Sequence, residues 1–184
     1  MGYPRTVRAI LALALLVPLL RAAADPQPQP TPGSGWPGSL RSGLPSELPG
    51  YESAPKDPYP DTDENGMGIY TQVSRRYQRI ESATVARSLV LVVQDYGRGK
   101  DLTGAIRDAT KEAGKASGFS SREQAIGGRP GFLVFHREGD KPVTVVTVIA
   151  SPSRLVLAVA DNIDETETLK LVSRVDFQKI ADAK

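Results

Sequence analysis

Apolar residues are distributed unevenly along the chain, which has an apolar N-terminus, a polar middle segment and a patterned region from residue 68 onward. In the patterned region, "YTQVSRRYQRI" at 70–80 alternates and predicts a strand with Val73 and Tyr77 on one face. The next stretch, "TVARSLVLVVQD" at 84–95, has apolar residues at consecutive positions. Both faces of this second strand should therefore be buried, as in the centre of a sheet.

Helical spacing follows these strands. The apolar positions of the first predicted helix are Leu102, Ala105, Ile106, Ala109 and Ala113. Because most of these side chains are small, we expect this helix to lie close to the sheet. Near the C-terminus, Asp164 followed three residues later by Glu167 fits a capping box and predicts the start of another helix. A last short turn, "DFQKIADAK", should present Phe177 and Ile180.

The most apolar stretch of the patterned region is "VTVVTVIASPSRLVLAVAD" at 143–161. A membrane span is disfavoured because Pro152 and Arg154 lie near its middle, where one arginine costs at least about 2.5 kcal/mol. Valine, threonine and isoleucine favour strands, and proline suits the second position of a tight turn. We therefore expect an antiparallel hairpin with strands at 143–150 and 155–160. The second strand has large side chains on one face and small ones on the other, but this does not show which face receives the helices.

Together these elements predict an α+β fold. We expect a single antiparallel β-sheet of about five or six strands, with an alanine-rich helix and a C-terminal helix packed on it. This globular domain should span residues 68–184.

The N-terminus has the layout of a secretory signal peptide. Arg5 and Arg8 precede an apolar run at 9–20, and a small-residue site at 22–24 predicts cleavage after Ala24. The alternative is a retained anchor, but 12 apolar residues are fewer than the roughly 20 that span a bilayer. We expect residues 1–24 to be removed and the protein to be periplasmic or extracellular.

Residues 25–67 are rich in proline and glycine and should form a disordered tether. Ten of the fifteen prolines lie between residues 25 and 60, a composition that favours extended conformations over a packed core. Trp36, the only tryptophan, lies inside this segment, and we expect it to be a loosely docked side chain.

Charge and cysteine content narrow the functional classes. The whole chain carries a net charge of +2, but removing the first 24 residues leaves 20 basic and 21 acidic residues. The near-neutral mature protein therefore gives no support to nucleic-acid binding. The absence of cysteine excludes disulfides, thiol catalysis, thiolate metal sites and a lipid-modified cysteine. We expect no cofactor.

His136, the single histidine, falls near the end of a strand predicted after a turn at 127–131. A hydrolase would have to use this residue, together with an activated serine on a tight elbow. The chain has no Gly-x-Ser-x-Gly motif, so we favour a strand-end histidine and keep the hydrolase as an alternative.

The stretch "DTDENG" at 61–66 resembles the start of a calcium loop. Asp61, Asp63 and Asn65 take its first three ligand positions, and Gly66 takes the position of its glycine. The twelfth position, where a glutamate should stand, is Gln72. We favour an acidic, solvated turn and keep calcium-dependent binding as an alternative.

Arg75, Tyr77 and Arg79 share one face of the first predicted strand. They could form a basic and aromatic strip that receives an anionic polymer or headgroup. The alternative, which we prefer, is an edge strand protected by charge.

The order of elements, with "VSRRYQRI", "VVQDYG", "GGRPGFLVFH", "RLVLAV" and a terminal "VDFQKIA", resembles small exported bacterial proteins of unassigned function. It also resembles the PsbP-like α+β domain. The resemblance covers residues 68–184 and implies a non-catalytic accessory or binding protein, with no site residue to carry over. We therefore expect an exported, non-enzymatic module of the bacterial cell envelope that binds an envelope protein or an anionic surface ligand.

Overall fold

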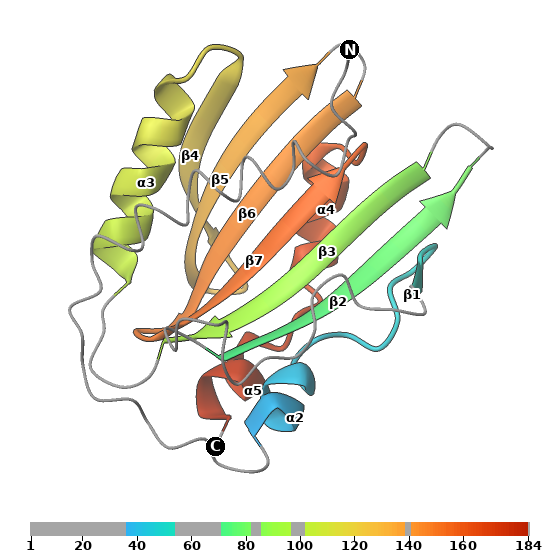
Figure 1. The fold of residues 1–184 in the computed structure, drawn as a ribbon, viewed down its shortest axis with the longest axis vertical. Coiled ribbons are helices and arrows are strands. Elements are labelled where there is room, and N and C mark those ends of the chain that lie inside the picture. Colours follow the sequence, from blue (N-terminus) through green and yellow to red (C-terminus); the bar gives the residue numbers. More distant parts are fainter. Residues whose placement is uncertain (1–35, 54–70, 82–85, 97–101, 139–140, 184) are drawn as a thin grey trace.

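The computed structural model describes residues 36–53, 71–81, 86–96, 102–138 and 141–183. Within these ranges, seven strands form one antiparallel sheet in the order β1-β2-β3-β7-β6-β5-β4, accompanied by four helices (Figure 1). The strands are β1 (Glu52–Ser53), β2 (Thr71–Ile80), β3 (Ala86–Asp95), β4 (Phe119–Ile126), β5 (Arg129–Glu138), β6 (Lys141–Ser151) and β7 (Arg154–Asp161). The helices are α2 (Trp36–Arg41), α3 (Thr103–Lys115), α4 (Glu165–Val172) and α5 (Phe177–Asp182).

The structure confirms the predicted class, a single antiparallel sheet in an α+β protein, but contains more strands than the five or six expected. One additional strand is β4, whose sequence FSSREQAI is mostly polar and exposed because it forms an edge of the sheet. The other is β1, which has two residues and lies within the predicted tether. Neither carries the apolar alternation on which the prediction relied.

The predicted hairpin at 143–161 is confirmed by the pairing of β6 with β7. Val145 lies opposite Val159, Val148 lies opposite Val156, and the strands are joined at Pro152 and Ser153. A register shift between Ile149 and Ser151 places a bulge at the end of β6, next to this turn. On its other side β7 pairs with β3, so the stretch lies in the middle of the sheet.

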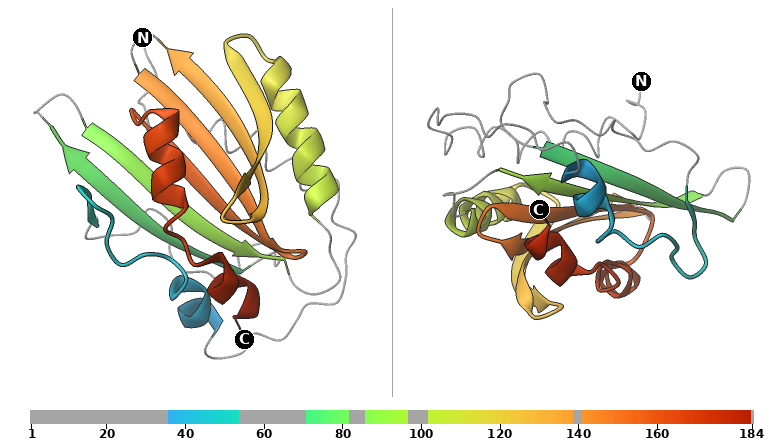
Figure 2. Two further views of the ribbon diagram at one scale, coloured as in Figure 1. Left: turned by 180° about the vertical axis from the view of Figure 1, so that it is seen from behind. Right: turned by 90° about the horizontal axis from the view of Figure 1, so that it is seen from below.

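The side chains on the two faces of β7 belong to different core clusters. The small side chains, with Ala158 and Ala160 fully buried, belong to the cluster that lies between the sheet and the helices α4 and α5. The large side chains, including Leu155 and Leu157, belong to the cluster that also contains the buried residues of α3. Figure 2 shows α4 and α5 on one face of the sheet. Helix α3 packs against the edge strand β4 and its neighbour β5.

The helices follow the predicted patterns. In α3, Ile106 and Ala109 are buried. Asp164 is the N-cap of α4, since its Oδ1 accepts a hydrogen bond of 2.8 Å from the backbone N–H of Glu167. Phe177 and Ile180 lie in α5, and both are buried. No helix within the described ranges has the length and apolar content to cross a membrane.

Residues 36–53 differ from the predicted tether because they pack against the sheet. After α2, the chain runs along β2 to the short strand β1 (Figure 2). Its apolar side chains are nearly inaccessible, with exposed fractions between 0% and 7%: Leu40, Leu44, Leu48 and Tyr51. Burying each leucine stabilises the packed form by about 1.5–3 kcal/mol. This gain offsets the conformational entropy that the proline-rich segment loses when it becomes ordered. We call residues 40–53 the strap. The predicted signal peptide lies outside the described residues.

Candidate functional site

A pocket of about 500 Å³ lies between the strap and the turn that joins α4 to α5. Strap residues 41–46 line one side of it. Arg75 of β2 lines it from the sheet, and Arg174 and Asp176 line it from the turn. The pocket therefore brings together three arginines from segments that are far apart in the sequence. We call it the arginine pocket.

Arg75 is held in place by the strap. Its Nη1 donates hydrogen bonds to the backbone carbonyl oxygens of Pro45, at 2.6 Å, and Leu44, at 3.4 Å. The hydroxyl of Tyr77 also donates to the carbonyl of Pro45. A guanidinium group has five N–H donors, so these contacts leave the other nitrogens of Arg75 available to a ligand.

Arg174 supplies an exposed charge from the turn between α4 and α5. Its backbone N–H donates to Leu171 at the end of α4, which fixes the position of the residue. Across the described parts of the chain, no hydrogen bond or ion pair uses its guanidinium group. This side chain therefore keeps its full capacity to bind an anion.

Asp176 offsets only part of this positive charge. Its Oδ1 accepts a hydrogen bond of 2.9 Å from the backbone N–H of Lys179, which caps α5. Its own backbone N–H donates to the carbonyl of Gly43 at 3.0 Å, joining the turn to the strap. A Cβ atom on Gly43 would overlap the side chain of Ile180. This glycine therefore allows the strap backbone to approach α5 closely.

The predicted basic strip does not form one open face. Tyr77 is fully buried beneath the strap, and Arg75 is partly covered by it. The side chain of Arg79 is 46% exposed, and its Nε lies 3.4 Å from Glu81. Of the three residues, Arg75 contributes to the arginine pocket, while binding of an anion along the whole strip stays a prediction.

A second pocket, of about 470 Å³, contains His136 and lies near the beginning of α4. The Nδ1 atom of His136 is 2.9 Å from the carbonyl oxygen of Gly118, so in the neutral ring Nδ1 carries the hydrogen and Nε2 is an acceptor. The ring stacks on Phe119, with centroids 4.3 Å apart. These contacts orient the imidazole through the backbone and an apolar ring.

The serines and charged groups of this second pocket do not form a catalytic arrangement with His136. Ser120 and Ser121 line the pocket, yet no serine hydroxyl bonds to His136 among the contacts described for the chain. Arg122 pairs with Glu165, and its guanidinium lies 5.2 Å from the ring centre of Phe135. A nucleophile–base contact of the kind that a hydrolase uses is therefore not part of the described geometry.

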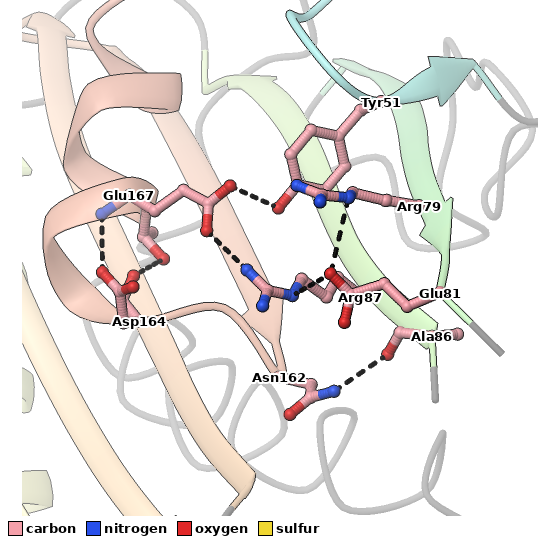
Figure 3. Close-up of polar contacts among 9 residues, drawn as sticks. Tyr51, Arg79, Glu81, Ala86, Arg87, Asn162, Asp164 and Glu167 are labelled. Atoms are coloured by element: carbon pink, nitrogen blue, oxygen red, sulfur yellow. Dashed lines mark hydrogen bonds and ion pairs between the residues drawn. The ribbon is translucent and has the colours of Figure 1, made fainter. Parts of the chain in front are cut away.

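A polar network joins the strap to α4 and to the sheet (Figure 3). Glu167 accepts hydrogen bonds from Tyr51, at 3.0 Å, and from Arg87, at 2.8 Å. Arg87 also lies 3.1 Å from Glu81. Burial of the phenol and its hydrogen bond to the Glu167 carboxylate raise the pKa of Tyr51 to about 12. Tyr51 therefore stays protonated at physiological pH and acts as a hydrogen-bond donor.

The predicted calcium ligands Asp61, Asp63 and Asn65 lie outside the described residues. Within those residues, the structure contains no cluster of three acidic, histidine or cysteine side chains that could hold a metal ion. Calcium binding at 61–66 stays a prediction, which a calcium-dependent rise in melting temperature, lost in Asp61→Ala, would support.

No protein-family model matches the chain, and no curated protein matches it in a sequence search. The resemblance to the PsbP-like domain therefore stays a prediction. What the structure defines is an α+β protein with an arginine-lined pocket, and its function has to be argued from that pocket.

Proposed function

We propose that this protein is an exported, non-enzymatic accessory module of the bacterial cell envelope that binds an anionic ligand in the arginine pocket. The observation that carries the proposal is the convergence of Arg41, Arg75 and Arg174 on one pocket. Planar guanidinium groups match the geometry of phosphate and carboxylate oxygens and form paired, charge-assisted hydrogen bonds with them.

The positions of the three arginines support binding of a discrete ligand. They lie on the strap, on a strand and in an inter-helical turn, so they approach the pocket from different elements. Arg75 is fixed by two backbone carbonyls, which reduces the conformational entropy that it loses when a ligand binds.

The environment of His136 favours binding over hydrolysis. Its Nδ1 contacts a backbone carbonyl, and its ring packs on Phe119, so both contacts have a structural role. The predicted signal peptide supports an exported protein, and because the chain has no cysteine, that protein relies on its apolar core for stability.

Isothermal titration calorimetry of the purified protein tests this proposal. Inorganic phosphate is one probe, and vesicles containing phosphatidylglycerol are another, so a soluble oxyanion and a lipid headgroup can be told apart. We expect saturable binding of at least one probe. Arg174→Ala should weaken it at least tenfold, because it removes a charge-assisted contact.

Arg107→Ala is the matched control, since it removes the same charge from α3, where the guanidinium pairs with Glu123 at 2.9 Å. It should leave the affinity within twofold of the wild type. Absence of saturable binding to both probes, or an equal loss in the two variants, would overturn the proposal.

A further inference from the structure

We propose that an oxyanion in the arginine pocket bridges the strap to the turn between α4 and α5, so that ligand binding and docking of the strap are coupled. This inference rests on the proposed function and adds to it the class of ligand and the segment that the ligand controls.

The walls of the pocket belong to two parts of the chain. Residues 41–46 come from the strap, whereas Arg75, Arg174 and Asp176 belong to the sheet and to the C-terminal turn. Undocking of the strap would therefore remove one wall, including Arg41. A ligand that contacts both walls binds the docked form alone, and by mass action it stabilises that form.

Basic side chains predominate among the described residues that line this seam. Arg75 and Arg174 lie on the sheet and turn side, where the carboxylate of Asp176 is engaged in capping α5. The guanidinium of Arg174 makes no hydrogen bond or ion pair among the described contacts, so an anion that it shares with the strap adds an attraction between the two walls.

Hydrogen bonds and buried side chains already hold the strap. Among the described contacts at the pocket are the bonds from Arg75 and Tyr77 to Pro45 and the bond from Asp176 to Gly43. Further along, Tyr51 bonds to Glu167, and the strap leucines are buried. The strap joins the sheet through the two-residue edge strand β1, whereas the central strands pair along both sides, so we expect the strap to open locally at a lower free-energy cost than they do. Its docking can therefore be shifted by a ligand.

The arrangement points to an oxyanion with several oxygen atoms. One guanidinium binds two oxygens in a plane, so arginines on opposite walls require further oxygens that point in different directions. A phosphoryl group meets this requirement, while a spherical halide does not offer separate acceptors. Inorganic phosphate is therefore the probe for the test.

Hydrogen exchange of the wild-type protein, with and without saturating phosphate, tests the coupling. We expect exchange to slow at least fivefold at the amides of Leu44, Tyr51 and Asp176, whose acceptors lie in the strap. The amide of Ile106, which bonds to Leu102 at the beginning of α3, serves as the internal reference and should be unchanged.

The possible outcomes separate the two proposals. Saturable binding of phosphate without slower exchange in the strap would overturn the coupling and leave the proposed function in place. Absence of phosphate binding would overturn this inference, whereas the proposed function would fall only if the phosphatidylglycerol vesicles also failed to bind. Slower exchange at the strap amides, with Ile106 unchanged, would support the coupling.

A pair of leucine variants tests the coupling from the other direction, because linkage between two equilibria is reciprocal. Leu48→Ala loosens the strap, and Leu48 is 3% exposed and does not line the pocket. Leu157→Ala is the matched control, since Leu157 is 5% exposed in the core on the opposite face of the sheet.

We expect Leu48→Ala to weaken phosphate binding at least fivefold and Leu157→Ala to change it less than twofold. Equal affinities in the two folded variants would contradict the coupling. If either variant fails to fold, the exchange experiment on the wild-type protein decides the question.

Discussion

The hydroxyl of Tyr51 donates a hydrogen bond of 3.0 Å to Glu167, a residue 116 positions further along the chain. The second carboxylate oxygen of Glu167 accepts from Arg87 at 2.8 Å. Figure 3 shows this glutamate between the strap tyrosine and the arginine of β3. Of the reciprocal capping box predicted at the start of α4, the structure describes one half, the bond from the Glu167 backbone to Asp164. The glutamate carboxylate instead fastens the strap to the sheet.

The side chains of Tyr51 and Glu167 should be energetically coupled through their hydrogen bond. Tyr51→Phe removes the hydroxyl alone and should lower the free energy of unfolding by about 1 kcal/mol. In a double-mutant cycle with Glu167→Met, which removes the acceptor, measured by urea denaturation, the two losses should add to more than the loss in the double variant. Strict additivity would show that the bond contributes nothing.

Tyr51 should also make stability depend on alkaline pH. Because its pKa is raised from 10 to about 12 in the folded protein, its contribution is fully present below pH 10. It should be lost progressively as the pH rises from 10 to 12, since the unfolded chain releases the proton first. Thermal melts across this range, compared with Tyr51→Phe, measure the effect. An identical pH profile in the variant would refute the assignment.

Arg154, the first residue of β7, should be sensitive to substitution because its ion pair with Asp95 is largely buried. Its Nε lies 2.5 Å from a carboxylate oxygen of Asp95, and its Nη1 donates to the carbonyls of Ile180 and Ala181 at the end of α5. The side chains of Asp95 and Arg154 are 1% and 14% exposed. Arg154→Met should destabilise the protein by about 3 kcal/mol, because it breaks a buried pair on one side.

Lys115→Met is the control for this loss, since it removes a lysine whose side chain is 69% exposed and which pairs with Glu112 on α3. Chemical denaturation should show a change of less than about 1 kcal/mol for this variant. If the free energy of unfolding fell equally in both variants, burial of the pair with Asp95 would not explain the loss of stability.

His136 should not be required for anion binding. His136→Ala removes the stacking on Phe119 and the contact with Gly118, both of which lie outside the arginine pocket. Titration with phosphate should therefore give an affinity within twofold of the wild type. Esterase activity in the wild-type protein that disappears in this variant would favour the hydrolase instead.

The strands with strong apolar patterns could be predicted from the sequence, whereas the edge strand β4 could not be predicted from its pattern. Its residues alternate poorly because much of the strand is exposed. A different signal was present, since Gly127 and Gly128 separate β4 from β5 with φ angles of +57° and +74°. Two glycines with positive φ form the tight turn of a hairpin, so this dipeptide indicated a strand on each side.

The candidate site was predictable only in part. Arg75 was recognised because it lies in a patterned strand. Arg41 lies in a proline-rich segment and Arg174 in a turn, and neither position has a local pattern that marks a site. The three residues meet through the packing of the strap leucines and the C-terminal helices, which is a property of the whole fold.

The position of β7 in the sheet determines when the sheet can finish folding. This strand is the last in the sequence and yet lies between β3 and β6, where it joins the two halves of the sheet. Until residues 154–161 leave the ribosome or a membrane translocase, the preceding strands form two separate groups with open edges. Completion of the sheet must therefore wait for β7, and until then the unpaired edges of β3 and β6 are exposed to aggregation.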